Sequence, residues 1–292
     1  MAYEFRARGV GELIDATFRI YRAYWWPLMQ SVGIILLPVG ILQAGLQALV
    51  QLAQERIQAD PSMWFFLIAV ALIARLPALL FALAGTFVGA PVVHQTAQAC
   101  FGADPGAGPA WRAVRSRFGR VLGAAGISTV LLAMAGAFAC CSCGLGGLVL
   151  GVFLSVFMPI IMLETAGIGQ SLQRSFKLVG ARFWQVVWTQ VVIYLIILIP
   201  ALLLGGAVLL LAVGDWRAFG EQLQSGGAFT SLLYFYIYLG VAVYSTLAGP
   251  IYSVSSTLIY FDLRVRLEGY DLDRAVTGAG LTTGGRVGDP VS

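Results

Sequence analysis

Residues 121–163 read VLGAAGISTVLLAMAGAFACCSCGLGGLVLGVFLSVFMPIIML, forty-three positions without a charged side chain. Arg120 precedes this stretch and Glu164 follows it. A transmembrane helix needs about 20 apolar residues to cross about 30 Å of hydrocarbon. The stretch is therefore long enough for two helices, with about three residues between them. The sequence predicts a membrane-spanning hairpin that reverses at the small residues CCSCG, positions 140–144.

The rest of the chain has the same character. It is 59% hydrophobic and 11% charged, whereas soluble domains are about 45–50% apolar and about 25% charged. Long apolar stretches lie near 27–52, 64–99, 121–139, 145–163, 183–213 and 229–261. Because backbone in lipid must satisfy its own hydrogen bonds, each stretch is expected to be a helix. We therefore expect an all-α integral membrane protein with six transmembrane helices. The charged N-terminal segment lacks a cleavable apolar core, so the first span is expected to insert uncleaved.

The basic residues predict an orientation for these spans. Fifteen of the 18 lysines and arginines fall on the side of both termini, and only Arg56 and Arg217 fall on the other. Cytoplasmic loops carry such an excess of basic residues, so both termini are predicted to be cytoplasmic. Arg75 has two interpretations. It lies at the outer boundary of the second span, or it is a buried functional arginine, which costs several kcal/mol unless paired.

Three segments of similar composition precede the odd-numbered spans. They are GELIDATFRIYRAYWWPL (11–28), PAWRAVRSRFGRVL (109–122) and GQSLQRSFKLVGARFWQVV (169–187), and each mixes basic and apolar residues at helical spacing. Such amphipathic helices lie in the plane of the membrane interface. The even-numbered spans each carry a late proline, Pro91, Pro159 or Pro250, which predicts a kink.

The pattern predicts three parallel repeats of one unit. Each unit is a basic amphipathic interfacial helix, a span out and a span back, so that the six spans form three hairpins. The units cover about 9–101, 108–166 and 168–275, within one membrane domain of residues 1–275.

The last unit ends in LIYFDLRVRLEGYDL (258–272). This segment resembles the closing signature of a bacterial family, the membrane domain associated with glycerophosphoryl diester phosphodiesterases. Residues 11–28 and LETAGIGQSLQRSFKLVGARFWQVV (163–187) also resemble that family, so the resemblance covers nearly the whole chain. It implies a multi-pass protein of the bacterial cytoplasmic (inner) membrane. The family's enzyme activity is not expected here, because a phosphodiesterase domain does not follow; residues 276–292 are expected to be a disordered cytoplasmic tail.

Two interpretations fit the charged residues of this signature. Asp262, Arg264, Arg266 and Glu268 would be cytoplasmic, after Tyr260 and Phe261 at the interface. In the first interpretation they stop the span, Gly269 caps the helix, and Asp262 with Arg266 forms an i,i+4 pair worth a few tenths of a kcal/mol. In the second they form a docking surface for a partner protein.

A candidate polar site follows from the three prolines. His94 and Ser253 stand three residues past Pro91 and Pro250, and a second set stands five residues past the three prolines: Thr96, Glu164 and Ser255. If the repeats surround one axis, these five residues line a polar vestibule near the cytoplasmic side for a lipid headgroup or a proton. The alternative is that Glu164 faces water beside the third basic segment.

No enzyme motif is present in the sequence. His94 is the one histidine, and there is no H-E-x-x-H, glycine-rich phosphate loop or nucleophile elbow. We therefore expect a non-catalytic protein without a cofactor, a metal site or a nucleic-acid partner. Cys140, Cys141 and Cys143 are interpreted as an inert turn or a disulfide in an oxidising exterior; zinc would need four ligands.

Two classes of function remain open. One is transport or lipid handling, with membrane lipids as partners and anionic lipids attracted to the basic segments. The other is a membrane anchor or assembly subunit that binds a partner protein through the basic helices and the C-terminal segment.

Overall fold

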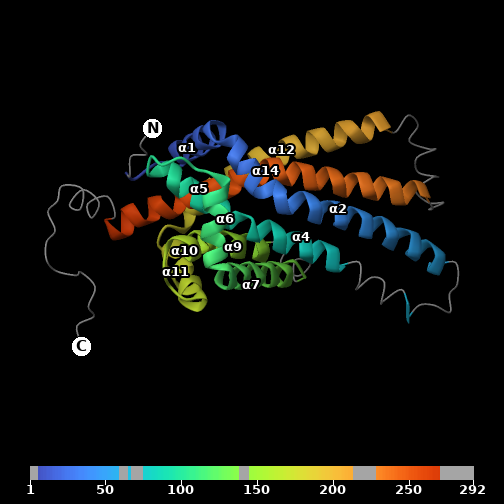
Figure 1. Cartoon of the computed structure of the whole chain (residues 1–292), viewed down its shortest axis with the longest axis horizontal. Coiled ribbons are helices and arrows are strands. Elements are labelled where there is room, and N and C mark those ends of the chain that lie inside the picture. Colours follow the sequence, from blue (N-terminus) through green and yellow to red (C-terminus); the bar gives the residue numbers. More distant parts are fainter. Residues whose placement is uncertain (1–5, 59–64, 67–74, 138–144, 213–227, 270–292) are drawn as a thin grey trace.

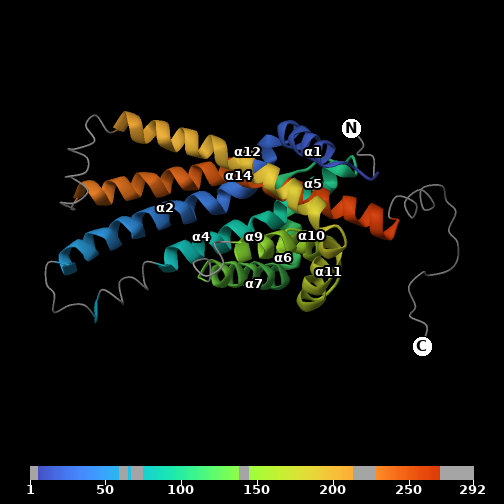
Figure 2. The same ribbon diagram turned by 180° about the vertical axis from the view of Figure 1, so that it is seen from behind.

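The chain folds into a helical bundle. The computed structural model describes residues 6–58, 65–66, 75–137, 145–212 and 228–269, and within these ranges there are helices and no strand. The principal helices are α1 (Val10–Ala23), α2 (Trp25–Gln58), α4 (Arg75–Phe87), α5 (Gly89–Cys100), α6 (Ala107–Ser116), α7 (Phe118–Ala137), α9 (Leu145–Leu154), α10 (Phe157–Leu163), α11 (Ile168–Ala181), α12 (Phe183–Ala212) and α14 (Ala228–Glu268). Figures 1 and 2 show the long axes of α2, α4, α7, α12 and α14 running roughly together.

Six segments are long and apolar enough to cross a membrane, which confirms the predicted number. They are Trp25–Leu52, Arg75–Cys100, Phe118–Gly136, Gly146–Leu163, Phe183–Gly206 and Phe229–Glu268. The second begins at Arg75, whereas the sequence suggested a start near 64; residues 67–74 lie outside the described ranges. The last continues to Glu268, because the charged residues of its final turns are accommodated inside the protein, as described below.

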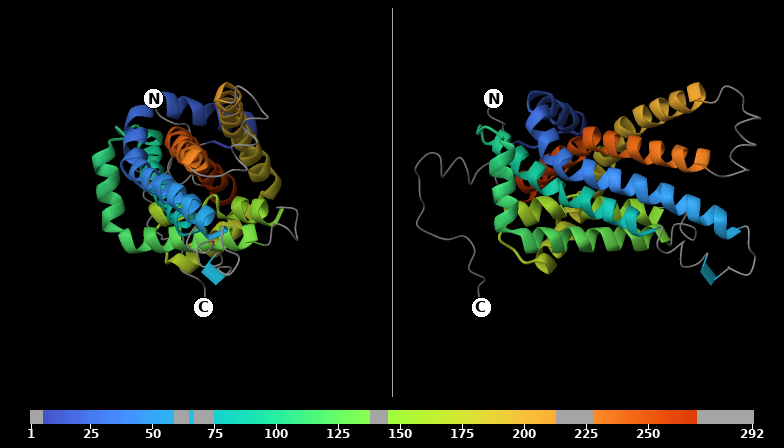
Figure 3. Two further views of the ribbon diagram at one scale, coloured as in Figure 1. Left: turned by 90° about the vertical axis from the view of Figure 1, so that its right-hand side faces the viewer. Right: turned by 45° about the vertical axis from the view of Figure 1, so that its right-hand side comes forward.

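The three amphipathic segments form helices, as predicted. α1, α6 and α11 each follow an extended glycine: Gly9, Gly106 and Gly167. Each helix ends at a single non-helical residue, and the next span begins directly after it; these residues are Tyr24 (φ −126°), Arg117 (φ −121°) and Arg182 (φ −136°). All three helices lie toward the same end of the bundle (Figure 3). We call this the basic end.

The prolines of the even-numbered spans act differently. Proline cannot donate to the carbonyl four residues earlier, so a helix breaks most easily just before it. α4 and α5 are separated at Val88, before Pro91, and α9 and α10 are separated at residues 155–156, before Pro159. Pro250 lies inside α14, whose helix continues through it, so the third returning span is not divided as the other two are. α14 packs along much of α2.

α14 is the centre of the bundle. It contacts α1, α2, α5, α10, α11 and α12, and Figure 3 (left) shows it between α12 and α2. Gly40 of α2 faces α14 so closely that a Cβ there would overlap the Cβ of Ala242.

Aromatic residues near the end of α14 belong to the core. The sequence placed Tyr260 and Phe261 at the membrane interface, but both are buried. The ring of Phe261 packs on that of Phe101, with centroids 5.9 Å apart. α1 also packs against α14, and the hydroxyl of the half-buried Tyr21 donates to the Leu247 carbonyl at 2.9 Å. Burial raises the pKa of the Tyr21 phenol above its ordinary value. Helix packing around the end of α14 therefore buries two aromatic residues that sequence position alone would leave exposed.

Arg75 is the first residue of α4, and its side chain is exposed. This agrees with the boundary interpretation and argues against a buried functional arginine.

Candidate functional site

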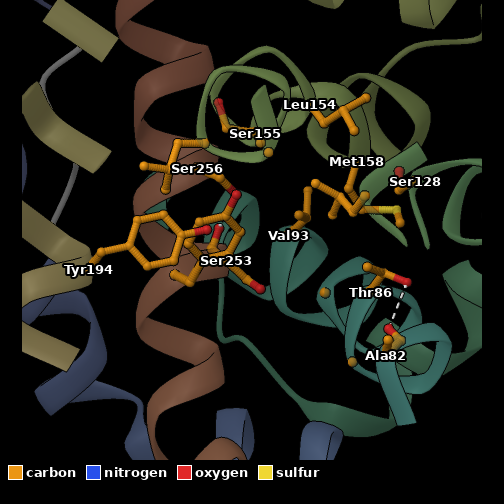
Figure 4. A pocket seen from close by; sticks show the side chains of 17 residues that line it. Ala82, Thr86, Val93, Ser128, Leu154, Ser155, Met158, Tyr194, Ser253 and Ser256 are labelled. Carbon is orange, nitrogen blue, oxygen red and sulfur yellow. Dashed lines mark hydrogen bonds between the residues drawn. The ribbon is translucent and has the colours of Figure 1, made fainter. Parts of the chain in front are cut away.

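A cavity of about 420 Å³ lies inside the bundle. Side chains from α4, α5, α7, α9, α10, α12 and α14 line it (Figure 4). Both helix breaks are at its wall: Gly89 directly follows the α4–α5 break, and Ser155 is part of the α9–α10 break. The cavity therefore lies where two of the three returning spans are discontinuous.

Glycines make room for this cavity. Gly85, Gly89, Gly147 and Gly151 all line it. A Cβ on Gly85 would meet nothing within 4 Å, and one on Gly147 or Gly151 would only reach α7 side chains at 3.9 Å. A Cβ on Gly89 would lie 3.4 Å from the Ser253 hydroxyl. Larger side chains at these positions would project into the space that is now open.

One end of the cavity is rich in hydroxyl groups. Figure 4 shows Tyr194, Ser253, Ser256 and Ser155 gathered on one side. Tyr252 lines the same end, and its ring lies 5.6 Å from the ring of Tyr194. Three parts of the chain, α12, α14 and the α9–α10 break, thus contribute hydroxyl groups to this end of the cavity. We call these groups the hydroxyl cluster.

The remaining wall is mainly apolar. Val93, Leu154 and Met158 lie beyond the hydroxyl cluster, and Thr86 and Ser128 stand on the far side (Figure 4). The Thr86 hydroxyl donates within its own helix, 2.9 Å from the Leu83 carbonyl. None of the 17 residues that line the cavity is charged. The site is therefore amphiphilic and neutral.

The exposed members of the wall show where the cavity opens. Leu148 of α9 is 63% exposed and Tyr194 of α12 is 46% exposed, although both line the cavity. Both residues belong to spans that are predicted to cross the membrane. Ala82, Gly85 and Leu132 of the wall are exposed as well, and they too belong to such spans. The exposed part of the wall therefore faces the surface that lipid would cover, and not an end of the bundle.

The five residues of the predicted vestibule have different surroundings. Ser253 is the one among them that lines this cavity. Thr96 is buried and its hydroxyl donates to the Val92 carbonyl at 2.8 Å, within α5. Ser255 is buried, and its hydroxyl has no hydrogen-bond partner among the described residues. His94 is half-buried on α5.

Glu164 instead belongs to a polar cluster at the basic end. It ends α10, and the Tyr260 hydroxyl donates to its carboxylate at 2.7 Å. Arg174 of α11 pairs with Glu164 at 2.9 Å and with Glu268 at 2.6 Å. Arg264 pairs with Glu268 at 2.9 Å. The two sequence interpretations of Glu164 are therefore both incomplete: it is only 17% exposed, and it joins three helices.

Asp262 is the centre of a second cluster, and its role corrects the docking prediction. Its carboxylate is 3% exposed. It accepts hydrogen bonds from the Arg8 amide at 2.7 Å, the Gln185 side chain at 2.9 Å and the Arg266 guanidinium at 2.9 Å. Arg266 also donates to the Arg8 carbonyl at 2.6 Å. Asp262 therefore connects the segment before α1, the start of α12 and the end of α14, and it is not available to a partner.

The helix ends where the capping interpretation predicted. α14 stops at Glu268, and Gly269 has φ +62°, the left-handed conformation that favours glycine. The predicted pair of Asp262 with Arg266 is formed, and Arg264 pairs with Glu268 in the same way.

Other predicted features lie elsewhere. Cys140, Cys141 and Cys143, like the tail 276–292, lie outside the described residues. Among the described residues, no group of three histidine, cysteine or acidic side chains is placed to hold a metal ion.

Comparison with family models, curated proteins and solved structures found no match for the chain. The resemblance in the sequence therefore stays a hypothesis.

The sequence contained a signal for the cavity that the proline register did not use. Small residues recur in the turns beside each proline: Gly85-Thr86 and Gly89 before Pro91, and Gly151 and Ser155 before Pro159. After Pro250 the chain reads Tyr252-Ser253, with Ser256 one turn later. Small residues at a helix break indicate open space beside the helix, and hydroxyl residues there indicate that this space has a polar wall.

Proposed function

We propose that this polytopic membrane protein binds a membrane-soluble amphiphile in its internal cavity, and that it serves transport or lipid handling without catalysing a reaction. The cavity carries this proposal. Its volume of about 420 Å³ falls in the range of small-molecule sites, about 300–1,000 Å³. Its opening at Leu148 and Tyr194 lies within spans, so a ligand that already dissolves in the bilayer has the shortest path to it.

The helix breaks support a role in moving a ligand. Breaks in membrane helices line the substrate sites of many transporters. The α4–α5 and α9–α10 breaks both lie at the cavity wall. A shift of α5 against α4, or of α10 against α9, would change the shape of the cavity.

We infer that the basic end is cytoplasmic and that the membrane is the bacterial inner membrane. Exposed aromatic residues stand at the start of each odd-numbered span: Trp25, Trp26, Phe118 and Trp184. Tryptophan is typical of the membrane interface, and excess arginine of the cytoplasmic side. Each amphipathic helix or its end also exposes basic residues, Arg19 and Arg22, Arg112 and Arg115, and Lys177 and Arg182. These residues suit contact with anionic lipid headgroups.

We further propose that the chain contains three copies of one unit. The support is the recurrence of an extended glycine, an amphipathic helix and a single non-helical residue before each odd-numbered span. Continuous α14 departs from the other two returning spans. Membership of the family associated with glycerophosphoryl diester phosphodiesterases belongs to the same proposal, on the residues quoted above.

An anchor or assembly subunit is the alternative function. It has less support, because Asp262, Arg264, Arg266 and Glu268 all pair within the chain. The exposed basic residues of the amphipathic helices are the remaining surface for a protein partner.

Native mass spectrometry of gently extracted protein tests the proposal. Gly151→Leu fills the cavity, and Gly126→Leu is its control, because a Cβ on Gly126 meets nothing within 4 Å and Gly126 does not line the cavity. We expect the wild type and Gly126→Leu to retain a bound lipid-like molecule that Gly151→Leu lacks. Identical retention in all three proteins would overturn the proposal. A co-purifying protein chain with no bound amphiphile would favour the anchor function.

A further inference from the structure

The absence of charged side chains from the cavity wall limits the kinds of ligand that the cavity can bind. Its wall has no charged residue, and the carboxylates and guanidinium groups of the two clusters at the basic end pair with one another. A phosphate that entered the cavity would lose its hydration without gaining a cation, and an unpaired buried ion costs several kcal/mol. The wall therefore disfavours an anionic headgroup.

Two serines at the polar end of the cavity can accept hydrogen bonds from a ligand, but their hydroxyl protons are already used in bonds to the backbone. Ser155 donates its hydroxyl proton to the Val152 carbonyl at 2.7 Å, and Ser256 donates its proton to the Ser253 carbonyl at 2.9 Å. A hydroxyl has one proton and two lone pairs, so both oxygens can still accept. A ligand group that satisfies them must be a donor.

The tyrosine pair adds a donor at the same end. The rings of Tyr194 and Tyr252 lie 5.6 Å apart, and both residues line the cavity. Each phenol carries one O–H group that can donate a hydrogen bond. The polar end therefore presents acceptors and a donor side by side, close to where Ser253 faces Gly89.

An alcohol matches this set, because its hydroxyl both donates and accepts. An ester or quinone carbonyl only accepts, and it would leave the serine lone pairs without a donor. The apolar side chains of Val93, Leu154 and Met158 beyond the hydroxyl cluster suit hydrocarbon (Figure 4). The opening at Leu148 leaves room for the rest of a chain to extend into the bilayer.

We infer that the cavity selects an uncharged lipid alcohol, with its hydroxyl at the Tyr194, Ser155 and Ser256 end, over a phosphate-bearing lipid with the same chains. This inference rests on the proposed function and names the class of ligand for the same site.

A matched pair of lipids tests it. 1,2-Dioctanoylglycerol and dioctanoylphosphatidic acid have the same acyl chains and differ in a hydroxyl against a phosphate. Both are titrated into the full-length wild-type protein in detergent, and the bound fraction is measured by native mass spectrometry. We expect dioctanoylglycerol to bind at least about tenfold more tightly, and Gly151→Leu to abolish this binding.

A second pair of variants tests the hydroxyl end. Ser155→Ala with Ser256→Ala removes the two acceptors and is expected to weaken dioctanoylglycerol about tenfold, the effect of losing hydrogen bonds to a buried donor. Ser116→Ala is the control: it removes the same kind of bond, from a serine to the carbonyl three residues earlier, at an exposed site on α6.

The outcomes separate the two proposals. Equal or tighter binding of dioctanoylphosphatidic acid, blocked by Gly151→Leu, would overturn the inference and leave the proposed function standing. Wild-type affinity for dioctanoylglycerol in the double serine variant would also overturn it. Binding of neither lipid, together with identical lipid retention in the two glycine variants, would overturn both.

Discussion

Replacing Asp262 with alanine tests whether the buried carboxylate holds the basic end together. Asp262 is 3% exposed and accepts three hydrogen bonds, from the Arg8 amide, the Gln185 side chain and Arg266. Asp262→Ala would leave the Arg266 guanidinium, whose side chain is 20% exposed, without its carboxylate. It would also remove the acceptor that joins the segment before α1 to α14.

The expected loss of stability can be worked from these contacts. A hydrogen bond to a charged group contributes about 1.5–3 kcal/mol, and removing one partner of a buried ion pair costs about 3–5 kcal/mol. Arg266 and Gln185 keep their bonds to the Arg8 carbonyl, so the three losses do not add fully. We expect Asp262→Ala to lower the free energy of unfolding by about 3–5 kcal/mol. Asp262→Asn, which keeps an acceptor oxygen, should lower it by about 2 kcal/mol.

The assay is an SDS unfolding titration of purified protein in mixed micelles. Asp15→Ala on α1 is the control, because Asp15 is exposed and such substitutions change stability by less than about 0.5 kcal/mol. The expected order of destabilisation is Asp262→Ala, then Asp262→Asn, then Asp15→Ala. If Asp262→Ala unfolds within about 0.5 kcal/mol of the wild type, the carboxylate is not a structural centre and the reasoning is wrong.

Three further predictions use the same titration. Gly40→Ala should lower the free energy of unfolding by about 1–3 kcal/mol through overpacking against Ala242. Its control, Gly45→Ala, meets nothing within 4 Å and should be neutral or stabilising by up to about 1 kcal/mol. Equal effects of the two variants would refute the close approach of α2 to α14 at Gly40. Gln190→Leu should raise the free energy of unfolding by about 1–3 kcal/mol. Gln190 is 1% exposed, and both polar atoms of its amide lack partners among the described residues. A loss of stability would mean that the amide has a bound partner. Gly269→Ala should cost about 1 kcal/mol, because its φ of +62° is strained for alanine; no change would mean that the end of α14 frays without cost.

Much of the fold could be predicted because it depends on local composition. The length of an apolar stretch sets a span, and the alternation of arginine with apolar residues sets an amphipathic helix such as α1. The effect of proline was less predictable. Pro91 and Pro159 follow helix breaks and Pro250 does not, although all three prolines stand late in their spans in the sequence.

The site was harder to predict because it depends on partners that are distant in sequence. Asp262 looks like a cytoplasmic charge in the sequence, yet it accepts from the amide of a residue 254 positions earlier. Tyr260 likewise resembles an interface residue in the sequence, but in the structure its hydroxyl bonds to Glu164, and α11 packs against α14. Of the vestibule residues only Ser253 reaches the cavity, since depth can be estimated from sequence position and the inward face cannot.

The unequal lengths of the helices have a consequence for the surrounding bilayer. α14 has 41 residues, α2 has 34 and α7 has 20, which at 1.5 Å per residue gives about 60, 50 and 30 Å. Figure 1 shows α2, α12 and α14 reaching well past α7 and α9. The long helices tilt or project beyond about 30 Å of hydrocarbon, whereas α7 only just crosses it. Lipids beside α7 and α9 therefore contact the shortest spans of the protein. A bilayer that is thicker than these spans must become thinner beside them. The cavity opening at Leu148 lies on α9, so we expect membrane thickness to govern how readily a ligand enters.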